Sequence, residues 1–189
     1  YKRGYNLIGT GEMGIGNTTA SSAIMKVIID ENLDLLVGRG TGLDDAGLAR
    51  KKDIIAKAIN LHKPNKEDAL DILSKVGGFE IGAIAGLILY CSAKKIPVVV
   101  DGFISSAGFL IAYLIKKEVK DYTLFAHRSN EKGHRIFFDF IGEKPILDLD
   151  MRLGEGTGSA LVFHIIEASA KMYLEMATFD SANVSRNAK

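Results

Sequence analysis

The chain has 189 residues, of which 47% are hydrophobic and 25% are charged, and its net charge at pH 7 is +1. This size and composition suit one globular domain with a sizeable core, and the near-neutral charge gives no indication of a nucleic-acid partner. There is no uncharged run long enough to span a bilayer and no signal peptide, so we expect a cytoplasmic protein without a membrane partner. The one cysteine, Cys91, lies in an apolar run, where a buried thiol is expected.

The predicted elements alternate between strands and helices along the chain. Strands are predicted at 5–8, 34–38, 96–100 and 122–126, with a further candidate at 145–149. Helices are predicted at 18–29, 44–61, 66–75, 81–93, 103–117, 135–141 and 159–179. The uninterrupted run Val98, Val99 and Val100 is typical of a strand buried on both faces of a parallel sheet. We therefore predict one α/β domain over residues 1–189, a doubly wound, mostly parallel, Rossmann-like sheet flanked by helices.

A glycine-rich segment follows the first predicted strand and leads into the first predicted helix. Residues 9–19 contain four glycines, namely Gly9, Gly11, Gly14 and Gly16. Glycines allow close approach of a ligand to the backbone, and the first turn of a helix offers unpaired N–H groups and a positive dipole end. Asn17 or Thr18 is expected to cap this helix. We interpret the segment as a phosphate-binding loop; the alternative is a tight turn without a ligand.

Two known phosphate motifs match this segment only in part. Residues 9–14 fit G-x-G-x-x-G, but the next predicted strand ends in a second glycine loop, 38–42, and not in the acidic residue that a ribose diol requires. Residues 11–18 differ from a P-loop at Asn17, which replaces the lysine that reaches the β- and γ-phosphates. A single phosphate, as in a mononucleotide, fits better than a dinucleotide or a triphosphate.

Polar or glycine-rich loops follow the predicted strands. They begin at Gly9, Gly38, Asp101, His127 and Gly154. In doubly wound sheets, ligands bind outside the carboxyl ends of the strands. We therefore expect these loops to meet in one crevice.

Glu155 is the strongest candidate for catalysis. It lies between Gly154 and Gly156 near a helix start, where little side chain crowds it and the helix dipole favours the ionised carboxylate. Such a carboxylate can act as a general base, and the alternative role is to stabilise the helix N-terminus. Glu12, in the first loop, would repel a phosphate, so we expect it to face a sugar hydroxyl or backbone N–H groups.

Each of two further polar residues has two alternative roles. Lys51, on the predicted helix 44–61, either reaches toward a phosphate or extends along the helix surface to solvent. Ser129, beside Arg128, either donates to a phosphate or stabilises its loop. The four histidines and the one cysteine do not have the spacing of a metal site, and we predict neither a metal nor a cofactor.

Several blocks of this sequence together resemble one enzyme family. The blocks lie at 11–19, 38–42, 76–81, 99–103, 127–129 with 133–134, and 152–158. In this order they resemble the nicotinate-nucleotide–dimethylbenzimidazole phosphoribosyltransferases of cobalamin biosynthesis, over nearly the whole chain. Because several blocks match, the resemblance is far more specific than any single glycine motif.

The resemblance implies transfer of phosphoribosyl from nicotinate mononucleotide to 5,6-dimethylbenzimidazole, giving α-ribazole 5′-phosphate and nicotinate. It implies that Glu155 deprotonates the benzimidazole, whose opposite nitrogen attacks the anomeric carbon with inversion. It also implies that Gly14, Lys51 and Ser129 hold the phosphate. Further expected substrate-binding residues are Glu12, Gly16, Asn17, Gly40, Thr41, Asp101, Gly154 and Gly156. Separately from the resemblance, we expect a homo-oligomer, namely a dimer, since the long apolar helices that start at Phe103 and Ser159 offer surface to bury against a second subunit or against an N-terminal region.

The chain departs from the family in two respects. Family members carry a substantial N-terminal region that contributes much of the benzimidazole pocket, so this chain resembles the larger, C-terminal part of the enzyme. Asn130 and Lys132 stand where the family more often has Ala and Pro. Three alternatives remain, namely a non-catalytic mononucleotide- or base-binding module, a fragment that is inactive without its N-terminal part, and an enzyme for another azole base.

Overall fold

A parallel sheet forms the centre of the molecule. The computed structural model describes residues 2–182. Its strands are β1 (Ile8–Gly9), β2 (Val98–Val100) and β3 (Thr123–Phe125), in the spatial order β1-β2-β3. Ile8 pairs with Val98, and Val98 pairs with Thr123. All three valines of β2 are buried, which confirms the predicted burial of this strand on both faces.

Helices lie on both faces of this sheet. Their bounds are α1 (Asn17–Ile29), α2 (Leu33–Leu36), α3 (Asp45–His62), α4 (Ala69–Val76), α5 (Phe79–Ala93), α6 (Phe103–Ile115), the 3₁₀ helix η1 (Lys117–Tyr122), α7 (Gly133–Ile141) and α8 (Thr157–Glu175). On one face, Val98 and Val100 join the main core with residues of α1 to α7. On the other face, Val99 packs with Val162 of α8. The predicted α/β class, with a parallel sheet between helices, is confirmed.

Helix α6 connects the main core to the sheet. Phe109 packs edge to face against Phe125 of β3 and Phe137 of α7, with ring centroids 4.9 Å and 6.0 Å away. Such aromatic pairs add specific geometry to the burial of their apolar area. Gly108 faces α5, where it permits close packing of the two helices. The start of α6 is thereby fixed at the carboxyl end of β2.

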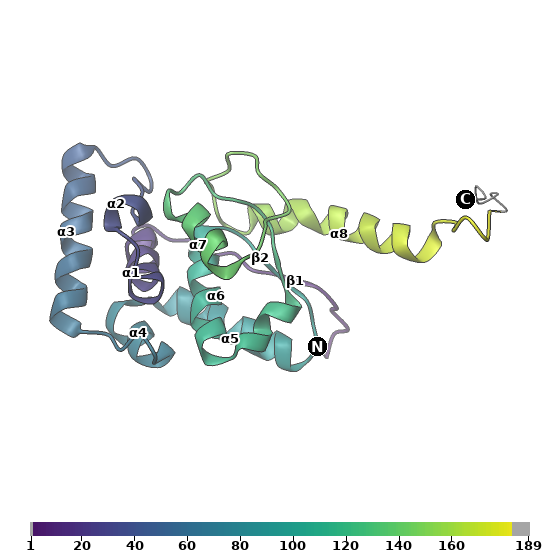
Figure 1. Ribbon diagram of the computed structural model, residues 1–189, viewed down its shortest axis with the longest axis horizontal. Coiled ribbons are helices and arrows are strands. Elements are labelled where there is room, and N and C mark those ends of the chain that lie inside the picture. The colour runs from purple at the N-terminus through teal and green to yellow at the C-terminus, as the bar shows by residue number, and fades with distance from the viewer. Residues whose placement is uncertain (1, 183–189) are drawn as a thin grey trace, which may run out of the picture.

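Helix α8 has few neighbours over most of its length. Its buried residues are Gly158, Ser159 and Val162, all near its N-terminus. The rest of the helix extends away from the body of the molecule (Figure 1). Within residues 2–182, no helix is long and apolar enough to cross a membrane.

The predicted strand at 34–38 is wrong, because this segment contains helix α2. Asn32 precedes the helix, and its side-chain oxygen accepts the N–H of Asp34 at 2.8 Å, which caps the first turn. Leu36 is fully buried against the main core. The apolar run alone is typical of a strand, but the capping residue in front of it indicates a helix.

The candidate strand at 145–149 forms only one bridge, between Leu147 and His127. The N–H of Leu147 donates to the carbonyl oxygen of Ala126 at 2.9 Å, so this segment lies beside the chain that continues from β3. The other predicted helices are present, with shifted ends.

A pair of glycine substitutions tests the packing of α5 on α6. Replacing Gly108 by alanine should lower the free energy of unfolding by about 2 kcal/mol, because a rigid core tolerates extra atoms poorly. The new Cβ would lie 2.6 Å from Cγ2 of Ile84 and 3.1 Å from the carbonyl oxygen of Ile81. Urea unfolding measures the change.

Gly86 on α5 is the matched control, since no described atom lies within 4 Å of its added Cβ. Alanine at this exposed helical position should leave stability unchanged or raise it by up to about 1 kcal/mol. Equal destabilisation in both variants would contradict the close contact at Gly108.

Candidate functional site

One cavity of about 870 Å³ lies where the predicted ligand loops meet the first turns of α1 and α6. Each of the five predicted loops contributes to its wall, which confirms that they converge. Most of the predicted site residues line it, namely Glu12, Gly14, Gly16, Asn17, Gly40, Thr41, Lys51, Asp101, Ser129, Gly154 and Glu155. Gly156 lies in an adjoining hollow of about 540 Å³, whose wall also includes Glu12 and Glu155.

Helix α1 begins at the cavity without a side-chain cap from the described residues. The prediction that Asn17 or Thr18 caps it is wrong, because Gly16, at φ 90°, is the N-cap residue. Asn17 instead donates its side-chain N–H to a carboxylate oxygen of Glu12. The N–H groups of Asn17 and Thr18 and the positive end of the helix dipole therefore remain at the cavity wall, whereas the N–H of Thr19 donates to the carbonyl oxygen of Gly16 at 3.0 Å. This arrangement is suited to an anion.

Lys51 lies beside this helix start. Its side chain is buried at 6% exposure, which rules out the alternative that it extends to solvent. Its Nζ donates to Oγ1 of Thr18 at 2.8 Å and to the carbonyl oxygen of Gly38 at 3.1 Å. Burial lowers the pKa of Lys51, and the nearby Glu131 partly offsets this effect. A buried ammonium between α1 and the second glycine loop can bind an anion.

Glu131 is a cavity residue that the sequence analysis did not select. Burial raises the pKa of its carboxyl group, while the charge of Lys51 and a backbone hydrogen bond at Gly40 lower it. Its Oε2 is buried and has no hydrogen-bond partner among the described residues. A signal was present in the sequence, since Glu131 lies between Ser129 and a glycine, Gly133, in a loop after a strand.

The carboxylate of Asp101 holds the loop that carries Glu155. Asp101 is 2% exposed at the end of β2, and it accepts the N–H of Gly156 at 3.0 Å and that of Ser159 at 3.2 Å. Its own N–H donates to Oγ1 of Thr10 at 3.1 Å. Asp101 thus ties the end of the sheet to the first turn of α8, where a carboxylate complements the helix dipole.

His127 lies next to Asp101 at the end of the third strand. It is 1% exposed, and its Nε2 lies 3.7 Å from Oδ1 of Asp101. Both ring nitrogens are without a hydrogen-bond partner within residues 2–182. His127 starts one of the predicted ligand loops but is not among the predicted site residues.

Glu155 is exposed on a loop with an uncommon backbone. Its φ is 58°, and Gly154 and Gly156 on either side both have φ 77°. A left-handed conformation costs a non-glycine residue about 1–2 kcal/mol, so the surrounding structure must impose it. Gly11 packs directly against this loop, because a Cβ there would lie 2.5 Å from the nitrogen of Gly156.

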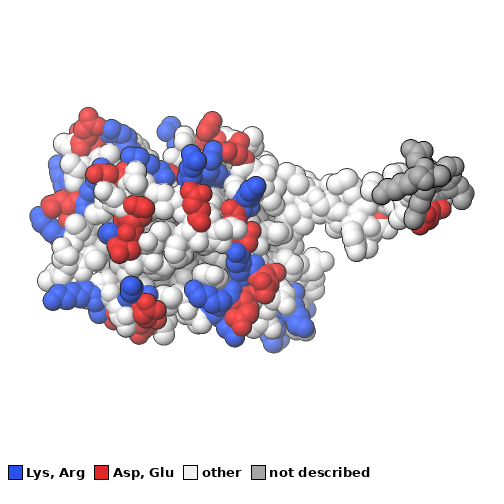
Figure 2. Space-filling view, in the orientation of Figure 1, with Lys and Arg blue, Asp and Glu red and all other residues white. Residues whose placement is uncertain are grey.

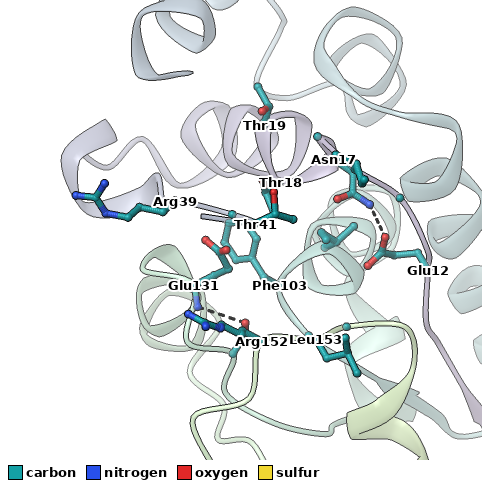
Figure 3. A pocket seen from close by; sticks show the side chains of 18 of the residues that line it. Glu12, Asn17, Thr18, Thr19, Arg39, Thr41, Phe103, Glu131, Arg152 and Leu153 are labelled. Carbon is teal, nitrogen blue, oxygen red and sulfur yellow. Dashed lines mark hydrogen bonds between the residues drawn. The ribbon is translucent and has the colours of Figure 1, made fainter. Parts of the chain in front are cut away.

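The cavity wall has charged side chains on two opposite sides. Figure 3 shows Arg39 and Arg152, with the carboxylate of Glu131 between them, on one side, and Glu12, bonded to Asn17, on the opposite, acidic side. Burial raises the pKa of Glu12; the hydrogen bond from Asn17 lowers it, and nearby carboxylates, including Glu155, raise it further. Among residues 2–182, no group of three or more His, Cys, Asp or Glu is arranged to hold a metal ion.

The chain matches one known protein family over nearly its whole length. The family model DBI_PRT, described as phosphoribosyltransferase, matches residues 1–184. The chain belongs to this phosphoribosyltransferase family. Its glycine loops, the cavity and the exposed Glu155 are therefore features of a phosphoribosyltransferase chain.

Two bacterial relatives carry the name nicotinate-nucleotide–dimethylbenzimidazole phosphoribosyltransferase. The protein of Desulfotalea psychrophila is 56% identical over 182 residues, which are 96% of this chain and 51% of the relative. That of Dehalococcoides mccartyi (strain BAV1) is 54% identical over 184 residues, which are 97% of this chain and 52% of the relative. The chain thus spans about half the length of the curated relatives it matches.

The fold of this phosphoribosyltransferase chain is similar to that of a solved relative. The crystal structure of CobT from Thermus thermophilus superposes with a TM-score of 0.93 at 40% sequence identity. The match covers 98% of this chain and 55% of the other. At this identity, the likeness supports a shared arrangement of the loops as well as a shared fold.

The raised pKa of Glu131 predicts a specific dependence of stability on pH. A folded-state pKa above the ordinary value of 4.5 means that the folded protein binds more protons than the unfolded chain. The contribution of Glu131 to the stability of the folded protein is therefore greatest below pH 4.5 and is lost as the pH rises through the folded-state pKa. The free energy of unfolding of Glu131→Gln minus that of the unchanged protein should therefore be larger at about pH 7 than at about pH 4.

Urea unfolding of both proteins at the two pH values measures this difference. Glu118→Gln is the control, because Lys116 lowers the pKa of the exposed Glu118 and the difference should be small and of opposite sign. If the free energies of unfolding of Glu131→Gln and the unchanged protein differed by the same amount at both pH values, the buried environment described for this carboxyl group would be contradicted.

Proposed function

We propose that the protein transfers phosphoribosyl from nicotinate mononucleotide to 5,6-dimethylbenzimidazole, in the synthesis of the lower ligand of cobalamin. The products are α-ribazole 5′-phosphate and nicotinate. One observation carries this proposal, namely that the exposed carboxylate of Glu155 shares a cavity with the anion-binding start of α1 and Lys51. The identity of 54–56% to relatives that carry this enzyme name supports it.

We assign the phosphate of the mononucleotide to Gly14, Lys51 and Ser129, with Gly40 and Thr41 nearby. The support is chemical, because this side of the cavity combines free N–H groups of a helix start with a buried ammonium. Gly16 and Asn17 belong to the same helix start. The ribose then extends toward the acidic side of the cavity.

In this proposal Glu155 removes the proton from one ring nitrogen of the benzimidazole. The opposite nitrogen donates its electron pair to the anomeric carbon as the bond from that carbon to the pyridinium nitrogen breaks. The electrons of the broken bond neutralise the pyridinium, so nicotinate leaves as a stable product. The general base should contribute about 10²–10⁴-fold to the rate.

The remaining predicted site residues support the reaction from the acidic side. Glu12 lies next to Gly154, whose added Cβ would be 3.3 Å from Oε1 of Glu12, and it can accept from a ribose hydroxyl. Gly154 and Gly156 give the Glu155 loop its backbone shape. Asp101 stabilises that loop through two accepted hydrogen bonds.

We further propose a cytoplasmic homodimer in which residues 1–189 act as one nucleotide-binding and catalytic domain. Exposed apolar residues along α8 support self-association, among them Leu161, Ile165, Met172, Tyr173 and Leu174. In Figure 2, most of this helix shows neither acidic nor basic side chains. The buried free thiol of Cys91 agrees with a reducing compartment.

Sedimentation velocity of the full-length protein should give twice the mass of one chain. Replacing Leu161 and Ile165 by aspartate should favour the monomer, because charges on a buried apolar interface are costly. Monomers of the unchanged protein at micromolar concentration would contradict the proposed dimer.

The catalytic role is tested by Glu155→Gln in the full-length protein. Nicotinate release in the presence of nicotinate mononucleotide and dimethylbenzimidazole should fall about 10²–10⁴-fold, because the amide cannot take a proton. Binding of the mononucleotide, measured by calorimetry, should change little, since Glu155 acts on the other substrate.

Glu118→Gln, which alters a carboxylate that is paired with Lys116 and lies outside the cavity wall, is the matched control. Unchanged turnover in Glu155→Gln would rule out the general-base role. Binding without any turnover in the unchanged full-length protein would favour a non-catalytic nucleotide-binding module instead.

A further inference from the structure

We propose that His134 is a positioning residue that holds Ser129 in place for the phosphate, an inference that rests on the proposed function. Ser129 is in the cavity wall, whereas His134 lies behind it in the first turn of α7 and is fully buried. Nδ1 of His134 accepts the backbone N–H of Ser129 at 2.8 Å. Nε2 of His134 lies 2.9 Å from Oγ of Ser106 on α6.

These two hydrogen bonds determine where the imidazole proton lies. A backbone N–H can only donate, so Nδ1 of His134 must be the unprotonated nitrogen. The neutral ring therefore carries its proton on Nε2 and donates it to the hydroxyl oxygen of Ser106. The opposite tautomer would place two hydrogens between Nδ1 and the nitrogen of Ser129.

The surroundings of His134 keep the ring neutral and fixed. Burial lowers its pKa to about 3, and the charges of His127 and Arg128 act in the same direction. Phe138 lies 4.7 Å from the ring and Phe103 lies 6.1 Å from it, measured between centroids. The ring is therefore enclosed by aromatic side chains and remains a hydrogen-bond acceptor for Ser129 at neutral pH.

Several hydrogen bonds hold the loop that carries Ser129, and the bond to His134 is a buried one. The N–H of Asn130 donates to the carbonyl oxygen of Met151 at 2.8 Å, and the N–H of Glu131 donates to Oγ of Ser129 at 3.3 Å. The bond to His134 connects this surface loop to α6, the central helix of the core. Ser129 is thus positioned from behind by a residue that does not touch the ligand.

Two variants of His134 separate positioning from simple core packing. His134→Asn places an amide oxygen near the position of Nδ1 and can still accept the N–H of Ser129. His134→Gln places its amide nearer the position of Nε2, so it keeps a partner for Ser106 and loses the bond to Ser129. Ser106→Ala is the control, because it removes only the bond on the other side of the ring.

In the full-length protein, His134→Gln should raise KM for nicotinate mononucleotide about tenfold, with kcat within about threefold. His134→Asn and Ser106→Ala should keep KM within about threefold. Hydrogen exchange of the Ser129 amide, followed by NMR, should accelerate about tenfold in His134→Gln alone. Equal effects of the Asn and Gln variants on KM and exchange would overturn the proposal.

The ring NMR spectrum of the unchanged protein provides a test that needs neither a variant nor turnover. It should show a proton on Nε2 of His134, none on Nδ1, and a coupling through the hydrogen bond from the nitrogen of Ser129 to Nδ1. A proton on Nδ1 would overturn the proposal, even if the variants fail to fold. Because these spectra and the exchange rates do not depend on catalysis, a lack of transferase activity would contradict the proposed function and not this contact.

Discussion

The candidate site depends on a buried carboxylate, that of Asp101, at the carboxyl end of the middle strand. Its negative charge is removed from water and is compensated by two backbone N–H groups at the start of α8. The same residue is bonded through its own N–H to Thr10 at the end of the first strand. An unpaired buried charge is costly, so a shift of α8 that broke these hydrogen bonds would destabilise the protein. Asp101 therefore fixes α8 on the sheet, although few apolar residues of this helix are buried.

The strained backbone of Glu155 follows from this anchor. The loop must leave the sheet edge, pass close to Gly11 and enter α8 within a few residues, and it does so through three successive left-handed residues. Glycine adopts this conformation freely, whereas for Glu155 it has a conformational cost. The cost is offset by the hydrogen bonds on the C-terminal side of the loop, which leaves the carboxylate exposed and its backbone fixed.

The sequence predicted those parts of the fold that depend on local patterns. The valines of β2 indicated a buried parallel strand because their branched side chains leave few alternatives. The segment at 34–38 was misjudged because its apolar run is short, and the cap at Asn32 decided in favour of a helix. The burial of Glu131 and His127 does not follow from local patterns, although their loop was a predicted ligand loop, because it results from packing against partners from other elements.

The contacts that close the site join residues that are far apart along the chain. Oγ of Ser159 donates to the carbonyl oxygen of Thr10 across 149 positions, and the bonds of Asp101 reach 91 residues back and 58 residues forward. Closing such long loops is entropically costly, and non-local contacts of this kind slow folding. During synthesis, the phosphate loop leaves the ribosome before residue 159 and stays without its hydrogen bond to Ser159 until then. The cavity wall is therefore completed by the loop at residues 152–155, which the start of α8 holds against the sheet, and not by the core of α1 to α7 alone.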